Sequence, residues 1–175
     1  METPCTPNSY DSSVPHQKGG LTLQLQSLRI NIDTPVDQLS CNDPPWPGHI
    51  YVIKYQDTSR VLTYDKGKGI VLAEYKGKSN QRWTCHSKEG WLGFANDPGE
   101  TTLFMGHYDN KQGKLHCWVN HHLPAEMFCV RKRLEDGFQI LGRIGGNLHP
   151  VGLDKAGDAA VIRHSEAWWG FTMLA

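Results

Sequence analysis

Histidines lie close to carboxylates at two places in this 175-residue sequence. His122 precedes Glu126, His164 precedes Glu166, and His149 begins a predicted strand. Imidazole and carboxyl groups are the side chains that most often transfer protons in enzymes. Gathered at one end of a fold, these groups could shuttle protons on an apolar substrate, as in a cofactor-independent small-molecule isomerase or cyclase. The alternative is that they are solvated loop residues.

The motifs of several other enzyme classes do not occur in the sequence. There is no Gly-x-Ser-x-Gly, no phosphate-binding loop and no His-Glu-x-x-His. His116, Cys117, His121 and His122 lie close together, but His116 and Cys117 would point to opposite faces of a strand. Their spacing also fits no standard zinc site. We therefore expect neither a metal nor a cofactor, and the sequence leaves open whether the protein is an enzyme.

Composition limits the kinds of binding partner and the cellular compartment that we expect for this protein. Eighteen Lys and Arg balance eighteen Asp and Glu, whereas a protein that binds duplex nucleic acid needs a cationic excess to neutralise phosphates. No apolar stretch is long enough to cross a membrane, and the first residues lack the basic start and apolar run of a secretory signal. The five cysteines include no Cys-x-x-Cys pair, which favours reduced thiols. We expect a cytoplasmic protein that binds neither nucleic acid nor membrane.

Three aromatic residues close three segments of nearly equal length. They are Trp83, Phe128 and Phe171, and the gaps between them are 45 and 43 residues. A period of about 40 to 50 residues is typical of repeat architectures. Each segment has four short apolar runs separated by turn residues, so we expect an all-β fold in which three repeats close into a barrel with a hairpin cap. The predicted strands are 50–53, 61–64, 70–73, 81–85, 91–94, 102–105, 115–119, 127–130, 137–141, 149–153, 160–162 and 169–174.

The end of the first segment carries a recognisable motif. Asn80-Gln81-Arg82-Trp83 resembles the Gln-x-Trp motif that closes each repeat of the ricin-type β-trefoil superfamily. The other two copies read Glu126-Met127-Phe128 and Trp169-Gly170-Phe171, so one true Gln-x-Trp is present. Gly90-Trp91-Leu92-Gly93-Phe94 also resembles fungal trefoil proteins of unassigned activity. The resemblance implies a β-trefoil of three four-stranded repeats.

The same resemblance implies a sugar site in the first repeat. The family's site pairs an Asp from the early part of a repeat with a stacking aromatic residue and with an Asn just before the Gln. Here the Asp is expected near Thr63, with Asp65 two residues later, and the matching aromatic residue and amide are Tyr75 and Asn80. The leading interpretation is a lectin-like protein that binds a glycan or another small ligand. The alternative for Tyr75 is an ordinary surface residue.

The chain divides at a cluster of helix and strand breakers. Pro44-Pro45-Trp46-Pro47-Gly48 separates an N-terminal extension, residues 1–46, from the β-trefoil domain, residues 47–175. Within the extension, residues 21–32 alternate apolar and polar side chains as a strand does. A lone strand exposes unpaired backbone groups, so we expect this one to pair with a sheet edge of its own chain or of a second copy, which would give a homodimer. The alternative is a disordered leader.

Overall fold

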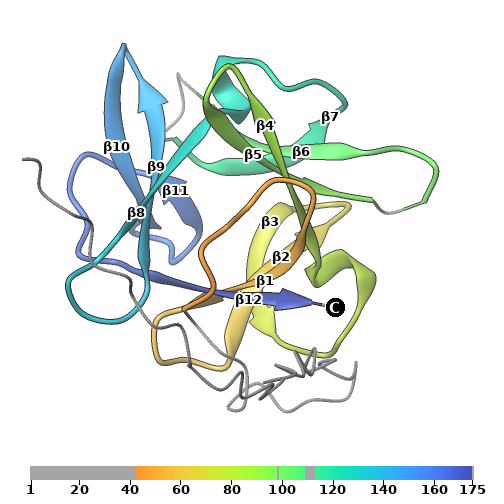
Figure 1. Ribbon diagram of the computed structural model, residues 1–175, viewed down its shortest axis with the longest axis horizontal. Helices are drawn as coiled ribbons and strands as arrows, with labels where there is room; N and C mark the ends of the chain where they lie inside the picture. The colour runs from red at the N-terminus through yellow and green to blue at the C-terminus, as the bar shows by residue number, and fades with distance from the viewer. Residues whose placement is uncertain (1–41, 98, 109–112, 175) are drawn as a thin grey trace, which may run out of the picture.

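Strands form the body of the molecule (Figure 1). The computed structural model of the chain describes residues 42–97, 99–108 and 113–174. The helices among these residues are two short 3₁₀ helices, and neither is long and apolar enough to cross a membrane. The all-β prediction is confirmed, and each predicted strand overlaps an observed one. The elements are β1 (Ile50–Tyr55), β2 (Arg60–Asp65), β3 (Gly69–Glu74), the 3₁₀ helix η2 (Ser79–Gln81), β4 (Trp83–Lys88), β5 (Trp91–Asn96), β6 (Leu103–His107), β7 (Leu115–Val119), the 3₁₀ helix η3 (Pro124–Glu126), β8 (Phe128–Lys132), β9 (Phe138–Ile144), β10 (Asn147–Leu153), β11 (Ala159–Val161) and β12 (Trp169–Leu174).

The β2–β3 hairpin illustrates how turn residues set the strand boundaries. Asp65 Oδ1 accepts hydrogen bonds from the backbone N–H groups of Gly67 at 2.9 Å and Lys68 at 3.0 Å. Gly69 follows with φ of 87°, a left-handed conformation that glycine adopts without a steric cost. β2 and β3 then pair antiparallel, from Asp65 opposite Gly69 to Arg60 opposite Glu74. The Asp65 side chain therefore stabilises the turn at the tip of this hairpin.

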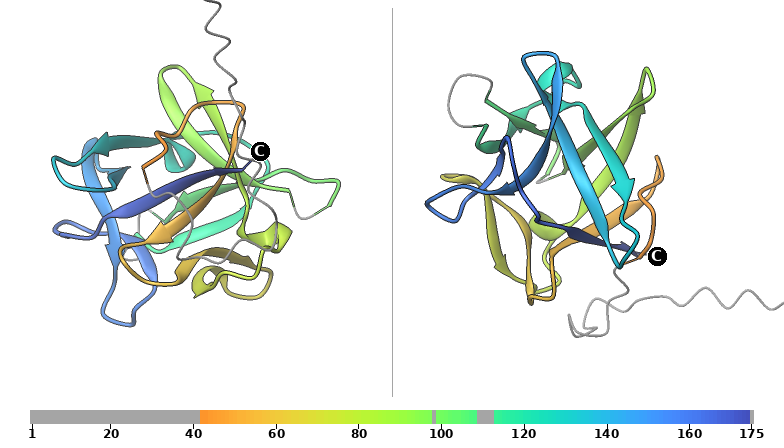
Figure 2. Two further views of the ribbon diagram at one scale, coloured as in Figure 1. Left: turned by 60° about the horizontal axis from the view of Figure 1, so that its bottom comes forward. Right: turned by 90° about the vertical axis from the view of Figure 1, so that its left-hand side faces the viewer.

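Six strands pair edge to edge into a closed ring. β1 pairs with β4, β4 with β5, β5 with β8, β8 with β9, β9 with β12, and β12 returns to β1. The closing pair runs from Ile50 opposite Leu174 to Tyr55 opposite Trp169. Figure 2 shows the dark-blue β12 beside the orange β1. Because a closed barrel has no free edge, the ring strands offer no template for pairing with another chain.

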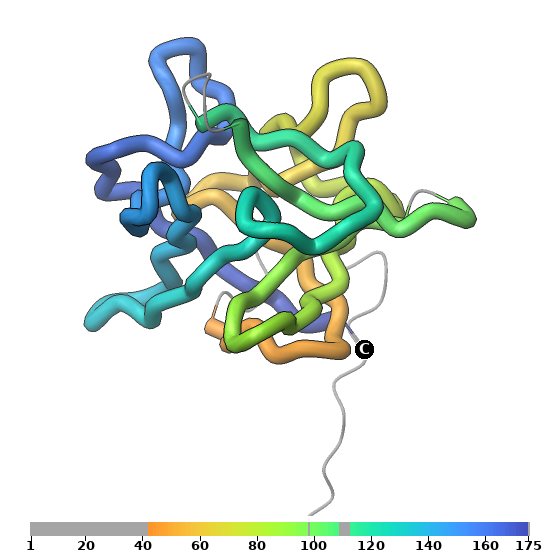
Figure 3. Tube along the Cα trace, turned by 90° about the horizontal axis from the view of Figure 1, so that it is seen from above, coloured from red at the N-terminus to blue at the C-terminus, as the bar shows by residue number. Residues whose placement is uncertain are grey.

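The other six strands form three hairpins attached to this ring. The hairpins are β2–β3, β6–β7 and β10–β11, and they continue from β1, β5 and β9 respectively. One pairing scheme therefore occurs at three places in the chain. In Figure 3 the yellow tip of the tube lies at the upper right of the molecule and the blue tip at the upper left.

Aromatic side chains at the start of three ring strands fill the centre. Trp83 begins β4, Phe128 begins β8 and Trp169 begins β12, and all three side chains are fully buried. Trp83 Nε1 donates a hydrogen bond to the Leu62 carbonyl oxygen at 2.9 Å, and Trp169 Nε1 donates to the Val151 carbonyl oxygen at 3.0 Å. These matching bonds place Trp83 and Trp169 at equivalent positions.

The prediction that Phe171 occupies the third of these positions is wrong. β12 begins two residues earlier, at Trp169, so Phe171 is the third residue of that strand. Phe171 is nevertheless fully buried. Its ring centroid lies 5.5 Å from that of Phe138 and 5.6 Å from that of Phe94, within the range of favourable aromatic pairs. It therefore belongs to the shared core rather than to the motif.

The residues that precede β1 contact the ring. Asn42 forms a parallel bridge with Phe171, and its Oδ1 accepts a hydrogen bond from Lys132 Nζ at 2.6 Å. Asp43 Oδ2 accepts one from the Met173 N–H at 2.8 Å. Part of the predicted extension thus packs on the domain. The predicted strand at residues 21–32 lies outside the described residues.

Candidate functional site

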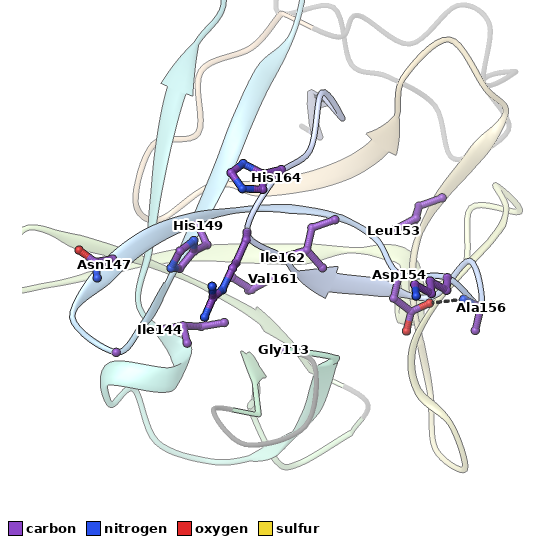
Figure 4. Close-up of a pocket in the computed structure, with 13 residues that line it drawn as sticks. Gly113, Ile144, Asn147, His149, Leu153, Asp154, Ala156, Val161, Ile162 and His164 are labelled. Carbon is purple, nitrogen blue, oxygen red and sulfur yellow. Dashed lines mark hydrogen bonds between the residues drawn. The ribbon is translucent and has the colours of Figure 1, made fainter.

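A pocket of about 1090 Å³ lies against β10 and the segment that follows β11 (Figure 4). Asn147 and His149 lie toward one end of it, and Leu153 and Asp154 lie toward the other. His164 also lines it. Two residues that the sequence analysis assigned to acid–base chemistry, His149 and His164, therefore share one pocket.

Strand alternation brings the side chains of β10 into this pocket. Successive side chains of a strand point to opposite faces, so Asn147, His149, Val151 and Leu153 share a face. Val151 is fully buried in the core, whereas the other three line the pocket. The rise of about 3.3 Å per residue gives this row a length of at most roughly 20 Å.

The wall opposite β10 is set by the β10–β11 register. Val161 pairs with Val151, and the Ile162 N–H donates a hydrogen bond to the Pro150 carbonyl oxygen at 2.9 Å. Arg163 and His164 follow Ile162 in the segment after β11. Both residues line the pocket.

A glycine lets this wall approach β10 closely. A Cβ atom at Gly152 would collide with Oγ of Ser165. Ser165 Oγ in turn accepts a hydrogen bond from the Ala167 N–H at 3.0 Å, which orders the segment leading into β12. The close packing of the segment after β11 on β10 therefore depends on the missing side chain at position 152.

Five polar side chains that line the pocket form no hydrogen bond or ion pair with other residues in the described part of the chain. They are Asn147, His149, Lys155, Arg163 and His164. Asp154 differs, because its Oδ1 accepts hydrogen bonds from the backbone N–H groups of Ala156 at 2.8 Å and Asp158 at 3.0 Å. The pocket therefore presents mainly donors and positive charge.

The remaining lining is apolar. Ile144, Leu153, Val161 and Ile162 supply aliphatic surface between the polar groups. A sugar ring has apolar C–H faces as well as hydroxyl groups, and ligand sites typically combine apolar walls with a few polar groups that fix orientation. The pocket has both kinds of surface.

Three side chains of the predicted first-repeat site form hydrogen bonds within the hairpin. Thr63 is buried, and its hydroxyl donates to the Val61 carbonyl oxygen and accepts from Gln81 Nε2, both at 3.1 Å. Asn80 Nδ2 donates to the Tyr64 carbonyl oxygen at 2.8 Å. Asp65 stabilises the hairpin tip, as described above.

Tyr75 lies at the other end of this hairpin. Its N–H donates to the Ser59 carbonyl oxygen at 3.3 Å, and its half-buried ring packs against Val52 and Val61. The structure therefore does not bring Tyr75 together with Asp65.

The other two acid–base candidates, His122 and Glu126, lie just before η3 and within it, outside the pocket. Glu126 is buried in η3, its Oε2 accepts a hydrogen bond from the Leu123 N–H at 3.1 Å, and the same atom lies 3.3 Å from His121 Nδ1. Burial raises the pKa of Glu126, although the Leu123 N–H and His121 oppose the shift. The carboxylate is thus paired with His121 rather than His122.

His122 has a different environment. Its half-buried ring stacks on Phe104, with centroids 5.2 Å apart and an interplanar angle of 18°. The ring also covers Gly93, where a Cβ atom would lie 2.7 Å from it. Burial lowers the pKa of His122. Glu166, the carboxylate near His164 in the sequence, lines a separate pocket of about 340 Å³ beside Arg131.

Sequence reasoning did not identify Asn147, Lys155 and Arg163. One available signal was the alternation of Asn147, His149 and Leu153 in β10. Arg163 could not be found this way, because it lies in the segment after β11 and reaches the pocket only through the fold. Among the described residues, no three His, Cys, Asp or Glu side chains gather closely enough to hold a metal ion.

The fold is similar to two solved structures. One is the GlcNAcα1-4Gal releasing endo-β-galactosidase from Clostridium perfringens, with a TM-score of 0.60 and 13% identity over 73% of this chain and 33% of that one. This chain therefore spans about one third of that enzyme's length. The other is the Macrolepiota procera ricin B-like lectin in complex with lactose, with a TM-score of 0.53 and 17% identity over 75% of this chain and 99% of that one. No protein-family model and no curated protein matches the sequence. The resemblance that the Gln-x-Trp motif predicted is thus confirmed at the level of fold: the chain has the fold of a ricin B-like lectin.

Proposed function

We propose that this protein is a carbohydrate-binding β-trefoil whose ligand occupies the pocket along β10. The three repeats are β1–β4, β5–β8 and β9–β12. The threefold pairing scheme supports this assignment, and so do the matching hydrogen bonds of Trp83 and Trp169.

One observation carries the functional proposal. Five polar side chains without partners among the described residues line one pocket together with aliphatic side chains. Unpaired donors can bind hydroxyl oxygens, and the aliphatic wall can cover the C–H face of a ring. The fold adds support, because one structural neighbour is a lectin in complex with lactose and another is an endo-β-galactosidase. A fold alone does not fix a function, so the pocket carries the greater weight.

The geometry favours this pocket over the first-repeat residues. Thr63, Asp65 and Asn80 already bond to the hairpin, and Tyr75 lies at its opposite end. A ligand there would have to compete with internal hydrogen bonds. In the β10 pocket, His149 and Arg163 have no described partner to displace.

A glycan array tests the proposal. The unaltered protein should retain at least one glycan, and Asn147→Ala or His149→Ala should weaken that retention without changing the melting temperature. His49→Ala is the matched control, because His49 is exposed and lies outside the pocket. Loss of retention with Tyr75→Ala but not with His149→Ala would move the site to the first repeat. Failure to retain any neutral or acidic glycan would refute carbohydrate binding.

A second candidate function follows from the two histidines in the pocket. His149 and His164 could transfer protons to and from a ligand held there, as in a cofactor-independent isomerase or cyclase. NMR spectra of a retained ligand, recorded during incubation with the protein, test this candidate. New ligand signals that grow with time and disappear with His149→Ala would support catalysis. Unchanged spectra would contradict catalysis and would be consistent with ligand binding without turnover.

Two expectations from the sequence stay predictions. They are the cytoplasmic location and the homodimer formed through residues 1–46, of which residues 1–41 lie outside the described structure.

A further inference from the structure

The charge of the pocket differs from that of the whole chain. The sequence has zero formal net charge, yet the pocket is lined by two permanently cationic side chains, Lys155 and Arg163, against one carboxylate, Asp154. His149 and His164 add positive charge whenever they are protonated. The cationic excess is therefore a local property of this surface.

The described carboxylates near the pocket do not form ion pairs with Arg163. Asp154 Oδ1 accepts two backbone N–H groups in the turn that it begins. Asp158 pairs with Lys114 at 2.6 Å, and Glu166 lines the other pocket. Arg163 forms no ion pair with any residue in the described ranges, in contrast to Arg133, which pairs with Glu135.

One group of side chains in the pocket suits an anionic group. Arg163 and His164 follow Ile162 in the chain, and both line the pocket together with His149. A guanidinium binds a carboxylate or a sulfate through two parallel hydrogen bonds, which are stronger than bonds between neutral groups. Asn147 lies toward the same end of the pocket as His149, where its amide can bind a neighbouring hydroxyl.

We propose that the β10 pocket selects acidic carbohydrates, that is, sugars that carry a carboxylate or a sulfate ester. The acidic group pairs with Arg163 and is flanked by His149 and His164, while Ile144 and Ile162 cover the ring. This inference rests on the proposed carbohydrate-binding function and adds the ligand class. Because Arg163 is exposed, the expected preference is modest, at most about fivefold over the neutral parent sugar.

Matched pairs of glycans on an array test the proposal. Each pair consists of a neutral parent and its acidic form, with uronate and sulfate forms in separate sets so that the two sources of charge are distinguished. The acidic member should bind more strongly in at least one set. Arg163→Gln should reduce the preference to near one, and raising the salt concentration should have the same effect, because salt screens exposed charges.

Arg143→Gln is the matched control for Arg163→Gln. Arg143 is an exposed arginine of the neighbouring strand β9 and does not line the pocket, so its removal should leave the preference unchanged. Equal binding of neutral and acidic members, or a preference that Arg163→Gln does not alter, overturns the acidic-ligand inference and leaves carbohydrate binding in place. Binding of no glycan of either kind overturns both.

Discussion

Trp83 and Trp169 donate equivalent indole hydrogen bonds, from Nε1 to the carbonyl oxygens of Leu62 at 2.9 Å and Val151 at 3.0 Å. Leu62 lies in β2 and Val151 in β10, whereas Trp83 begins β4 and Trp169 begins β12. The bonds connect the β2–β3 hairpin to β4 and the β10–β11 hairpin to β12. Phe128, which begins the ring strand β8, has no side-chain N–H group to donate.

Trp83→Phe and Trp169→Phe should destabilise the protein to a similar extent. Each change leaves a buried carbonyl oxygen without its donor, at a cost of about 1–3 kcal/mol. Urea unfolding monitored by circular dichroism measures the free energy of unfolding. Trp83→Ala should cost more, about 3–5 kcal/mol, because it also opens a cavity. Unequal costs for the two Phe variants, with one near zero, would contradict the equivalence.

Glu126→Gln should stabilise the protein at neutral pH. Burial raises the pKa of Glu126, so the folded state binds this proton more tightly than the unfolded state does. Ionisation of Glu126 therefore lowers the free energy of unfolding as the pH rises through the raised pKa. A glutamine cannot ionise, and its side-chain oxygen can still accept the Leu123 N–H.

The pH dependence is the decisive part of that prediction. The difference in unfolding free energy between Glu126→Gln and the unaltered protein should be close to constant below the ordinary pKa of glutamate. It should increase in favour of the variant as the pH rises above it. His121→Ala serves as the control for loss of the ion pair. A variant that loses stability relative to the unaltered protein as the pH rises would show that His121 outweighs burial.

Cys85 and Cys117 should resist alkylation in the folded protein. Both side chains are fully buried, and burial raises the pKa of each thiol to about 12, so very little reactive thiolate is present near pH 8. Cys129 is half-buried and should react first of the three. Peptide mapping after iodoacetamide treatment assigns each site. Rapid labelling of Cys85 or Cys117 at low denaturant would contradict the packing of the core.

Removal of residues 1–41 should leave the domain folded. The contacts of the extension with the ring begin at Asn42 and Asp43 within the described chain, and the truncated protein keeps both residues. If residues 1–46 form a homodimer, the truncation should convert a dimer into a monomer. Light scattering of both proteins measures the mass. Two monomeric proteins would remove the dimer hypothesis.

The strands could be predicted from the sequence because local signals mark them. Turn residues such as Asp65 and Gly69 bound short apolar runs, and no run is long enough for a helix. The third closing aromatic was misassigned because Trp168, Trp169 and Phe171 lie together, and Ala167 replaces the Gln of the motif. Two alignments of the repeat are then equally plausible without the hydrogen bond from Trp169 to Val151.

The candidate site was less accessible to sequence reasoning. His149 and His164 were chosen for their chemistry, and the structure brings them into one pocket. The motif around Gln81 points instead to residues that hold the hairpin together, since Gln81 bonds Thr63, Glu74 and the Lys76 N–H. Amide and hydroxyl side chains that stabilise a hairpin are of the same types as those that bind a sugar. The two roles can be distinguished only when the hydrogen-bond partners of these side chains are known.

The most direct test of carbohydrate binding is an NMR titration of ¹⁵N-labelled protein with lactose and, separately, with digalacturonic acid. We expect saturable shift changes centred on the amides of Asn147, His149, Arg163 and His164, with larger changes for digalacturonic acid at equal concentration. The amides of Tyr75 and Asn80 should not shift. Changes centred on Tyr75 and Asn80, or no saturable change with either sugar, would contradict carbohydrate binding in the β10 pocket.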